Sequence, residues 1–248
     1  MNDIYTAFNE FFELVMADSE ELLKEVYRLR YQVLCIEERL PGFDSSRYPY
    51  GLEEDEYDRH SSHILLRHRS SDSFIGTVRL ILQDPLDPGK PFPIELHAQI
   101  DSDIVDINHL PRQHVAEISR FTIVGQFSKR RAQYASVDAE LRTKGITNRR
   151  RFPSICVALI VGIVRMCAKH NISHWLSVMD PALNRLLSCY GSDLHPIGPL
   201  IDYHGIRRPY YIKLVDVLDR MYENHREIWE LVTDYGRIFS LPMNDVKK

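Results

Sequence analysis

Residues 115–124 read VAEISRFTIV, an apolar and largely β-branched run that contains two charged side chains. Such a run is typical of a buried strand. Glu117 and Arg120 therefore occupy positions where a core-like pattern favours apolar residues. In a regular strand a spacing of three places them on opposite faces. They share a face only if a β-bulge intervenes, and bulges often lie beside active sites.

The segments on both sides of this strand alternate between strand and helix patterns. Further strands are predicted at FFELVMA (11–17), SHILLRH (62–68), FIGTVRLIL (74–82), HWLSVM (174–179) and RPYYIKLV (208–215). Helices are predicted at 18–34, at 153–171, at 181–191 and near the C-terminus as far as about 235. In the first helix Asp18 is the expected N-cap and Glu21 completes a capping box. The polar turn SSDS (70–73) joins two of the strands as an antiparallel hairpin.

This order of elements predicts an α/β fold with a mixed central sheet flanked by helices. The 248 residues, 44% of them apolar, can bury a substantial core. We expect a single domain over residues 1–248, with a mobile basic insertion at about 132–151.

Two more arginines stand in apolar surroundings. In the first helix Leu22, Val26, Leu29 and Val33 belong to one apolar stripe, and Arg30 lies near its centre. In a second strand, Arg79 follows the apolar start of FIGTVRLIL. An arginine directed toward the interior requires a carboxylate or phosphate partner.

Residues 51–58, GLEEDEYD, can supply such partners, since they place five carboxylates within six consecutive positions. We expect Glu53, Asp55 and Asp58 to face inward onto the arginines, and Glu54 and Glu56 to face solvent. These charges can either fix the fold as internal salt bridges or form a site. The pattern alone favours neither interpretation over the other.

The bulk charge excludes a general affinity for nucleic acid or anionic membranes, because the net charge is −4. A local exception lies between Lys129 and Arg151, where eight residues are basic and two are acidic. Such a basic segment attracts acidic partners. The four cysteines show no metal-like spacing, which favours reduced thiols in a cytosolic protein. No signal peptide or membrane span is expected.

The charged residues resemble, in order and spacing, the signature of the acyl-homoserine-lactone (autoinducer) synthases, which belong with the N-acyl amino acid synthases to the GNAT acyltransferase superfamily. The matching set is Arg30, Glu53, Asp55, Asp58, Arg79 in GTVRL, and Glu117 and Arg120 in AEISRF. The C-terminal half, above all DYHGIRRPYY (202–211), is similar to acyltransferases associated with PEP-CTERM/exosortase gene clusters.

The resemblance implies a GNAT-like fold and a bacterial, cytoplasmic N-acyltransferase without a tightly bound cofactor. It implies catalytic roles for Glu117 and Arg120, and substrate binding by Arg30, Glu53, Asp55, Asp58 and Arg79. The implied donor is an acyl carrier protein (ACP) or coenzyme A (CoA) thioester, and the implied acceptor is the amine of an amino acid or similar small molecule. Because GQFSKRRAQ (125–133) is basic and lacks the usual pyrophosphate loop, we expect Lys129, Arg130 and Arg131 to dock an acyl carrier protein.

Several alternatives stay open on the sequence. Leu34 and Leu40 stand where autoinducer synthases carry aromatic residues beside S-adenosylmethionine, which disfavours homoserine-lactone synthesis without excluding it. A metal site at Asp55, Asp58, His60 and His63 has no common ligand spacing, so no metal is expected. Cys35 lacks an identifiable His–Asp partner set for covalent catalysis. A non-catalytic acyl-ligand-binding protein on the same fold is the last alternative.

Overall fold

A computed structural model describes residues 2–128 and 154–239, and the predicted basic insertion at 132–151 lies outside these residues. The strands are β1 (Phe12–Met16), β2 (Ser61–His68), β3 (Ser73–Ile81), β4 (Val115–Ile123), β5 (His174–Met179), β6 (His195–Pro196), β7 (Ile201–Asp202) and β8 (Ile206–Lys213). The helices are α1 (Asp3–Phe11), α2 (Glu20–Arg30), α3 (Pro93–His97), α4 (Gly125–Ser128), α6 (Ile155–His170), α7 (Pro181–Ser188), α8 (Leu214–Asn224) and α9 (Arg226–Val232). Short 3-10 turns and one π-helix, η1 (Tyr31–Glu37), complete the described elements.

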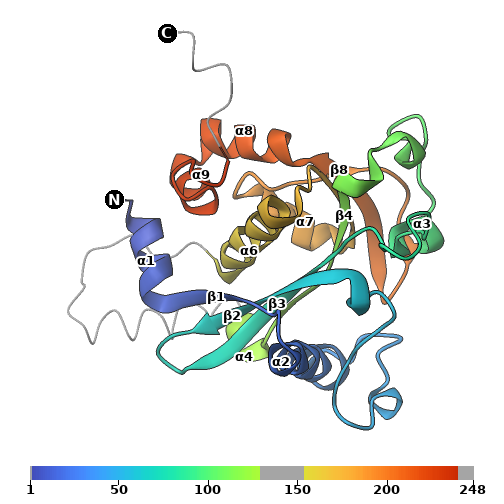
Figure 1. The fold of residues 1–248 in the computed structure, drawn as a ribbon, viewed down its shortest axis with the longest axis horizontal. Helices are drawn as coiled ribbons and strands as arrows, with labels where there is room; N and C mark the ends of the chain where they lie inside the picture. Colours follow the sequence, from blue (N-terminus) through green and yellow to red (C-terminus); the bar gives the residue numbers. More distant parts are fainter. Residues whose placement is uncertain (1, 129–153, 240–248) are drawn as a thin grey trace.

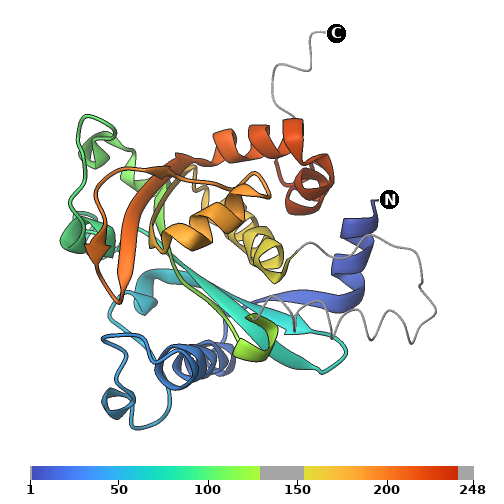
Figure 2. The ribbon, with the colours of Figure 1, turned by 180° about the vertical axis from the view of Figure 1, so that it is seen from behind.

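The strands form one mixed sheet in the order β1-β2-β3-β4-β5-β8-β6, with β7 paired to β8. All neighbouring strands run antiparallel except β4 and β5, which are parallel. Helices cover both faces, with α1, α6, α8 and α9 on one side and α2 on the other (Figure 1). The view from behind shows the same layers (Figure 2). The predicted α/β fold with a mixed, helix-flanked sheet is confirmed.

Helix α6 forms the centre of the core. Twelve of its residues are buried, because it lies between the sheet and the helix α9. Gly162 permits its close approach to β2, since a Cβ there would lie 2.7 Å from Cγ2 of Ile64. Trp175 and Trp229 are buried in this core. No helix within the described residues is long and apolar enough to cross a membrane.

Several boundaries differ from those predicted. Ser19, not Asp18, caps α2, because its hydroxyl accepts a hydrogen bond from the Leu22 amide at 3.3 Å. The predicted helix to residue 34 changes at Tyr31 into the π-helix η1. The C-terminal helix is two helices that meet at His225, and α1 has no counterpart among the predicted elements.

Candidate active site

A cluster of three arginines and three carboxylates lies beside β3 and β4. Arg30 at the end of α2 pairs with Glu53 and bonds Asp58 at 2.7 and 3.2 Å. Arg79 on β3 contacts Asp58 at 2.9 Å and Asp55 at 2.6 Å. Arg120 on β4 bonds Glu53 at 2.9 Å and Asp55 at 2.8 Å. Each arginine thus bridges two carboxylates, and the six charges sum to zero. We call these six residues the charge cluster.

The charge cluster divides GLEEDEYD as predicted. Glu53 is fully buried and Asp58 nearly so, while the side chain of Asp55 is 27% exposed. Glu54 and Glu56 are exposed, and Glu56 pairs with Lys90 at the surface. The inward and outward orientations of the five carboxylates are therefore confirmed.

The arginines determine the ionisation of these carboxyls. Burial by itself raises the pKa of Glu53, Asp55 and Asp58, but the charges of the neighbouring arginines outweigh it and hold each pKa below its ordinary value. His63, next to Asp58, has its pKa lowered to about 4 by burial and by the charge of Arg30. The cluster therefore keeps its three negative charges at neutral pH, while His63 is uncharged.

A β-bulge in β4 brings Arg120 to this cluster. Thr77 pairs with Thr122 and Arg79 with Ser119, so β4 holds one more residue than β3 over this interval. Arg120 adopts a left-handed conformation with φ of 50°, which few non-glycine residues adopt. The bulge that the spacing of Glu117 and Arg120 requires is therefore present.

Glu117 has surroundings of a different kind. Its side chain lies in the buried part of β4 and accepts a hydrogen bond from the Ile94 amide at 2.8 Å. No salt bridge to Glu117 occurs within the described part of the chain. Burial raises its pKa to about 7, although the Ile94 amide and the charges of Arg79 and Arg120 oppose that shift. Such a carboxyl is partly ionised near neutrality, as a general base requires.

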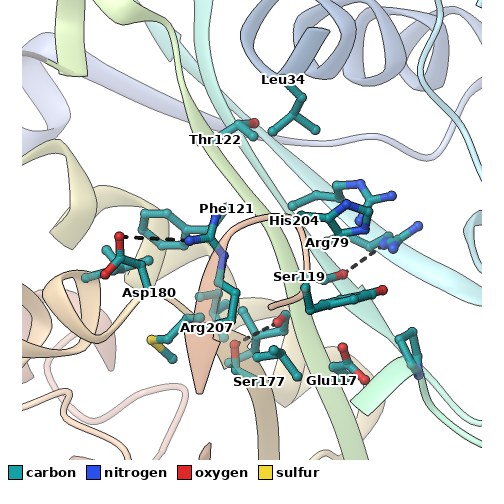
Figure 3. A pocket seen from close by; sticks show the side chains of 18 of the residues that line it. Leu34, Arg79, Glu117, Ser119, Phe121, Thr122, Ser177, Asp180, His204 and Arg207 are labelled. Carbon is teal, nitrogen blue, oxygen red and sulfur yellow. Dashed lines mark hydrogen bonds and ion pairs between the residues drawn. The ribbon is translucent and has the colours of Figure 1, made fainter. Parts of the chain in front are cut away.

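Immediately beyond Glu117 the two parallel strands separate. Their pairing ends at Glu117 and Leu176, while β4 continues beside β3 and β5 continues beside β8. The hydroxyl of Ser177 donates to the Ile118 carbonyl at 3.0 Å, which supplies a partner where the ladder has ended (Figure 3). We call the opening between β4 and β5 beyond this last pair the slot.

A cavity of about 350 Å³ occupies the slot. Charged and aromatic side chains form one part of its wall: Asp55, Tyr57, Arg79, Glu117, Arg120, Tyr203 and His204. Apolar side chains from β5, α6, α7 and the segment after α7 form another: Ile160, Ile163, Trp175, Leu183, Leu187 and Leu194. Figure 3 shows Arg79, Ser119 and Glu117 along β3 and β4, with Ser177 on the neighbouring strand. The volume suits a small-molecule ligand with one polar and one apolar portion.

The predicted site residues that the structure describes divide into two groups. Asp55, Arg79, Glu117 and Arg120 line the cavity. Arg30, Glu53 and Asp58 do not line it, and complete the charge cluster behind Arg79 and Arg120. Lys129, Arg130 and Arg131 lie outside the described residues.

The other candidate chemistries find little support in this arrangement. Within the described residues no three His, Cys, Asp or Glu side chains are grouped to hold a metal ion. His60 instead lies near Asp84, at 3.5 Å. Cys35 is buried, and burial raises the pKa of its thiol, which disfavours a thiolate nucleophile.

The sequence did not identify some residues of the cavity wall. Ser177 and Asp180 line the cavity because β5 separates from β4. Such a separation leaves no local pattern in the sequence. Arg207 had a possible signal, a basic residue at the start of the last strand, GIRRPYY. His204 belongs to DYHGIRRPYY, for which the family resemblance already made a role in the substrate pocket plausible, and its Nδ1 lies 2.7 Å from the Pro41 carbonyl oxygen.

Comparisons with known proteins agree with this fold. Residues 29–137 match the family described as the acetyltransferase (GNAT) domain. The acyl-homoserine lactone synthase BjaI, solved with SAM and isopentyl-CoA, is 15% identical with a TM-score of 0.58, over 94% of this chain and 91% of that one. FeeM, an N-acyl amino acid synthase from uncultured soil microbes, is 11% identical with a TM-score of 0.51, over 86% and 95%. TofI, solved with an inhibitor and MTA, is 17% identical with a TM-score of 0.52, over 84% and 96%.

The fold is therefore GNAT-like, and it is shared with acyl-homoserine lactone synthases and an N-acyl amino acid synthase. At these identities the likeness concerns the fold alone. No curated protein sequence matches this chain.

Proposed function

We propose that the protein is an N-acyltransferase, which moves a fatty acyl group from a pantetheine thioester to the amine of an amino acid or similar small acceptor. The observation that carries this proposal is the position of Glu117. A buried carboxyl with a pKa of about 7 lies where β4 and β5 separate, in a cavity with one charged and one apolar part. A base, a polar acceptor and a fatty acyl chain can be accommodated there together.

The chemistry follows from that arrangement. A neutral acceptor amine attacks the thioester carbonyl, and its proton passes to Glu117 directly or through a water molecule. The tetrahedral intermediate collapses as the carbon–sulfur bond breaks, and the leaving thiolate takes up a proton. Beyond Glu117 no further β4–β5 pairs follow, so backbone N–H groups on that side of β4 are placed to bind the oxyanion.

The charge cluster then has a supporting and a binding part. Arg79 and Arg120 reach the cavity and are proposed to bind the acceptor or its developing charge, with Asp55 beside them. Arg30, Glu53 and Asp58 are proposed to act on substrate through these two arginines. Glu53 and Asp58 accept hydrogen bonds of 2.9 to 3.2 Å from the two guanidinium groups, and Arg30 pairs with both carboxylates.

The donor and the setting are proposed in finer detail from the sequence. We favour an acyl carrier protein docked by Lys129, Arg130 and Arg131, in the bacterial cytoplasm, and a kinship with the PEP-CTERM/exosortase-associated acyltransferases. Support for coenzyme A as the other donor comes from BjaI, which is described as CoA-dependent. Support for an amino acid as the acceptor comes from FeeM, which is described as an N-acyl amino acid synthase.

Purified protein incubated with acyl carrier protein or coenzyme A thioesters and a panel of amino acids tests the proposal. We expect release of free thiol and a product whose mass equals that of the N-acyl amino acid. Glu117→Gln should lower kcat by about 100- to 10,000-fold and retain affinity for the acyl ligand. Retained affinity without turnover in the unmodified protein would instead indicate a non-catalytic acyl-binding protein. A lactone formed from S-adenosylmethionine would indicate a homoserine-lactone synthase.

A further inference from the structure

Arg207 lies at the end of the slot opposite Glu117. Leu176 pairs with Glu117 on one side and with Tyr211 of β8 on the other. Arg207 is four residues from Tyr211 along β8, and by the same register it lies opposite Asp180. Four residues of strand span about 13 Å. The backbone of Arg207 is therefore about 13 Å beyond the last β4–β5 pair along the strand direction, toward the open end of the slot.

Arg207 is less closely paired with carboxylates than the arginines of the charge cluster. Its Nη1 lies 3.9 Å from a carboxylate oxygen of Asp180, whose side chain is 54% exposed (Figure 3). Asp180 also caps α7, since its other oxygen accepts the Ala182 amide at 2.7 Å. An exposed pair at this separation is weak. Glu38 lines the same cavity, but no ion pair within 4 Å joins it to Arg207 among the described residues. Its Nη1 also donates to the Ile206 carbonyl at 3.2 Å, and the other N–H groups of the guanidinium are available for an anion.

The position of Arg207 also restricts which anion it can reach. The carboxylate of an α-amino acid is only two bonds from the amine, so an acceptor with its amine beside Glu117 spans much less than the roughly 13 Å between the strand positions of Glu117 and Arg207. A pantetheine thioester is a long arm with a phosphate at its far end. Strand pairing from Val115 to Glu117 closes one end of the slot, so such an arm enters from the other.

We propose that Arg207 binds the phosphate of the donor's pantetheine arm at the open end of the slot, while the thioester lies beside Glu117. This inference rests on the proposed acyltransferase function and extends it to recognition of the donor. Phosphopantetheine on an acyl carrier protein and coenzyme A share this phosphate. The planar guanidinium suits two parallel hydrogen bonds to phosphate oxygens.

The experiment compares two donors that differ only in the phosphate, acyl-phosphopantetheine and acyl-pantetheine, on the full chain and its variants. Unmodified protein should show kcat/KM about 10- to 100-fold higher with the phosphorylated donor, the range of a charge-assisted hydrogen bond. Arg207→Gln should remove this preference, so that the ratio of kcat/KM between the two donors falls to about one. Arg207→Lys should retain part of it. Arg185→Gln, which removes an exposed positive charge on α7 outside the cavity wall, is the matched control and should retain all of it.

Acyl-CoA and acyl carrier protein, tested on the same variants, then report which source of the phosphate depends on Arg207. Equal losses with both small donors, no loss with either, or an effect confined to the KM of the acceptor would each overturn the inference. Calorimetric titration with phosphopantetheine and pantetheine, without acyl group or acceptor, separates this inference from the proposed function. Binding that depends on both the phosphate and Arg207, without acyl transfer to any amine, would refute the function and leave the phosphate site intact.

Discussion

The charge of Arg79 acts both on the charge cluster and on Glu117 in the slot, yet the carboxyls of these two regions differ in their ionisation. In the cluster, arginines contact Asp58 from two sides and lower its pKa. In the slot, Glu117 accepts a hydrogen bond from the Ile94 backbone amide, and burial raises its pKa to about 7. Direct pairing therefore stabilises a permanent charge, whereas burial without a paired cation leaves a carboxyl free to exchange a proton. The first arrangement suits a scaffold and the second suits catalysis.

The strongest test of this comparison is Glu117→Gln. The amide oxygen can still accept from the Ile94 amide, so the fold should be preserved, but the proton acceptor is lost. We expect kcat to fall by about 100- to 10,000-fold. Steady-state kinetics and a thermal melt on the same preparation measure both effects. A variant that keeps its activity would exclude Glu117 as the base.

The same chemical change in the cluster should act on stability instead. Asp58→Asn removes the charge that Arg30 and Arg79 share, and leaves a net positive charge among buried groups. We expect the free energy of unfolding to fall by about 3–5 kcal/mol. Urea denaturation measures it, and Glu56→Gln, at an exposed acidic position of the same stretch, serves as the control. Equal effects of the two substitutions would contradict the structural role of the cluster.

The sequence predicted much of the cluster because its members are anomalies in periodic patterns. Arg30 interrupts a helical stripe, Arg79 and Arg120 interrupt strands, and the acidic stretch offered the only dense set of partners. The cavity was less accessible, because it results from the separation of β4 from β5 and from the packing of α6 and α7. Such long-range geometry leaves no local pattern. The ionisation of Glu117 likewise depends on segments distant in sequence, since burial raises its pKa and the hydrogen bond from the Ile94 amide opposes that shift.

The two regions should also contribute opposite pH dependence to stability. Glu117 has an ordinary pKa of 4.5 and about 7 in the folded protein, so between these values the folded state holds a proton that the unfolded state has released. Its contribution is complete below pH 4.5 and is lost as pH rises through about 7, on the order of 3 kcal/mol. The cluster carboxyls, with lowered pKa values, lose their contribution as pH falls through the acid range. Unfolding curves of unmodified protein and Glu117→Gln at each pH isolate the first contribution, which should be absent from the variant.

The smallest expected effect concerns the point where the pairing of β4 with β5 ends and the slot begins. Ser177→Ala removes the hydroxyl that donates to the Ile118 carbonyl, and leaves that acceptor without its partner at the point of separation. We expect a loss of about 1 kcal/mol in the free energy of unfolding, the usual net value of one hydrogen bond. Ser188→Ala is the matched control, because that hydroxyl donates to the Arg185 carbonyl on an exposed turn of α7 and its loss should change stability by less than about 0.5 kcal/mol. If both variants unfold alike, the strands separate without help from Ser177, and the packing of α6 and α7 against the sheet is then sufficient to hold the slot open.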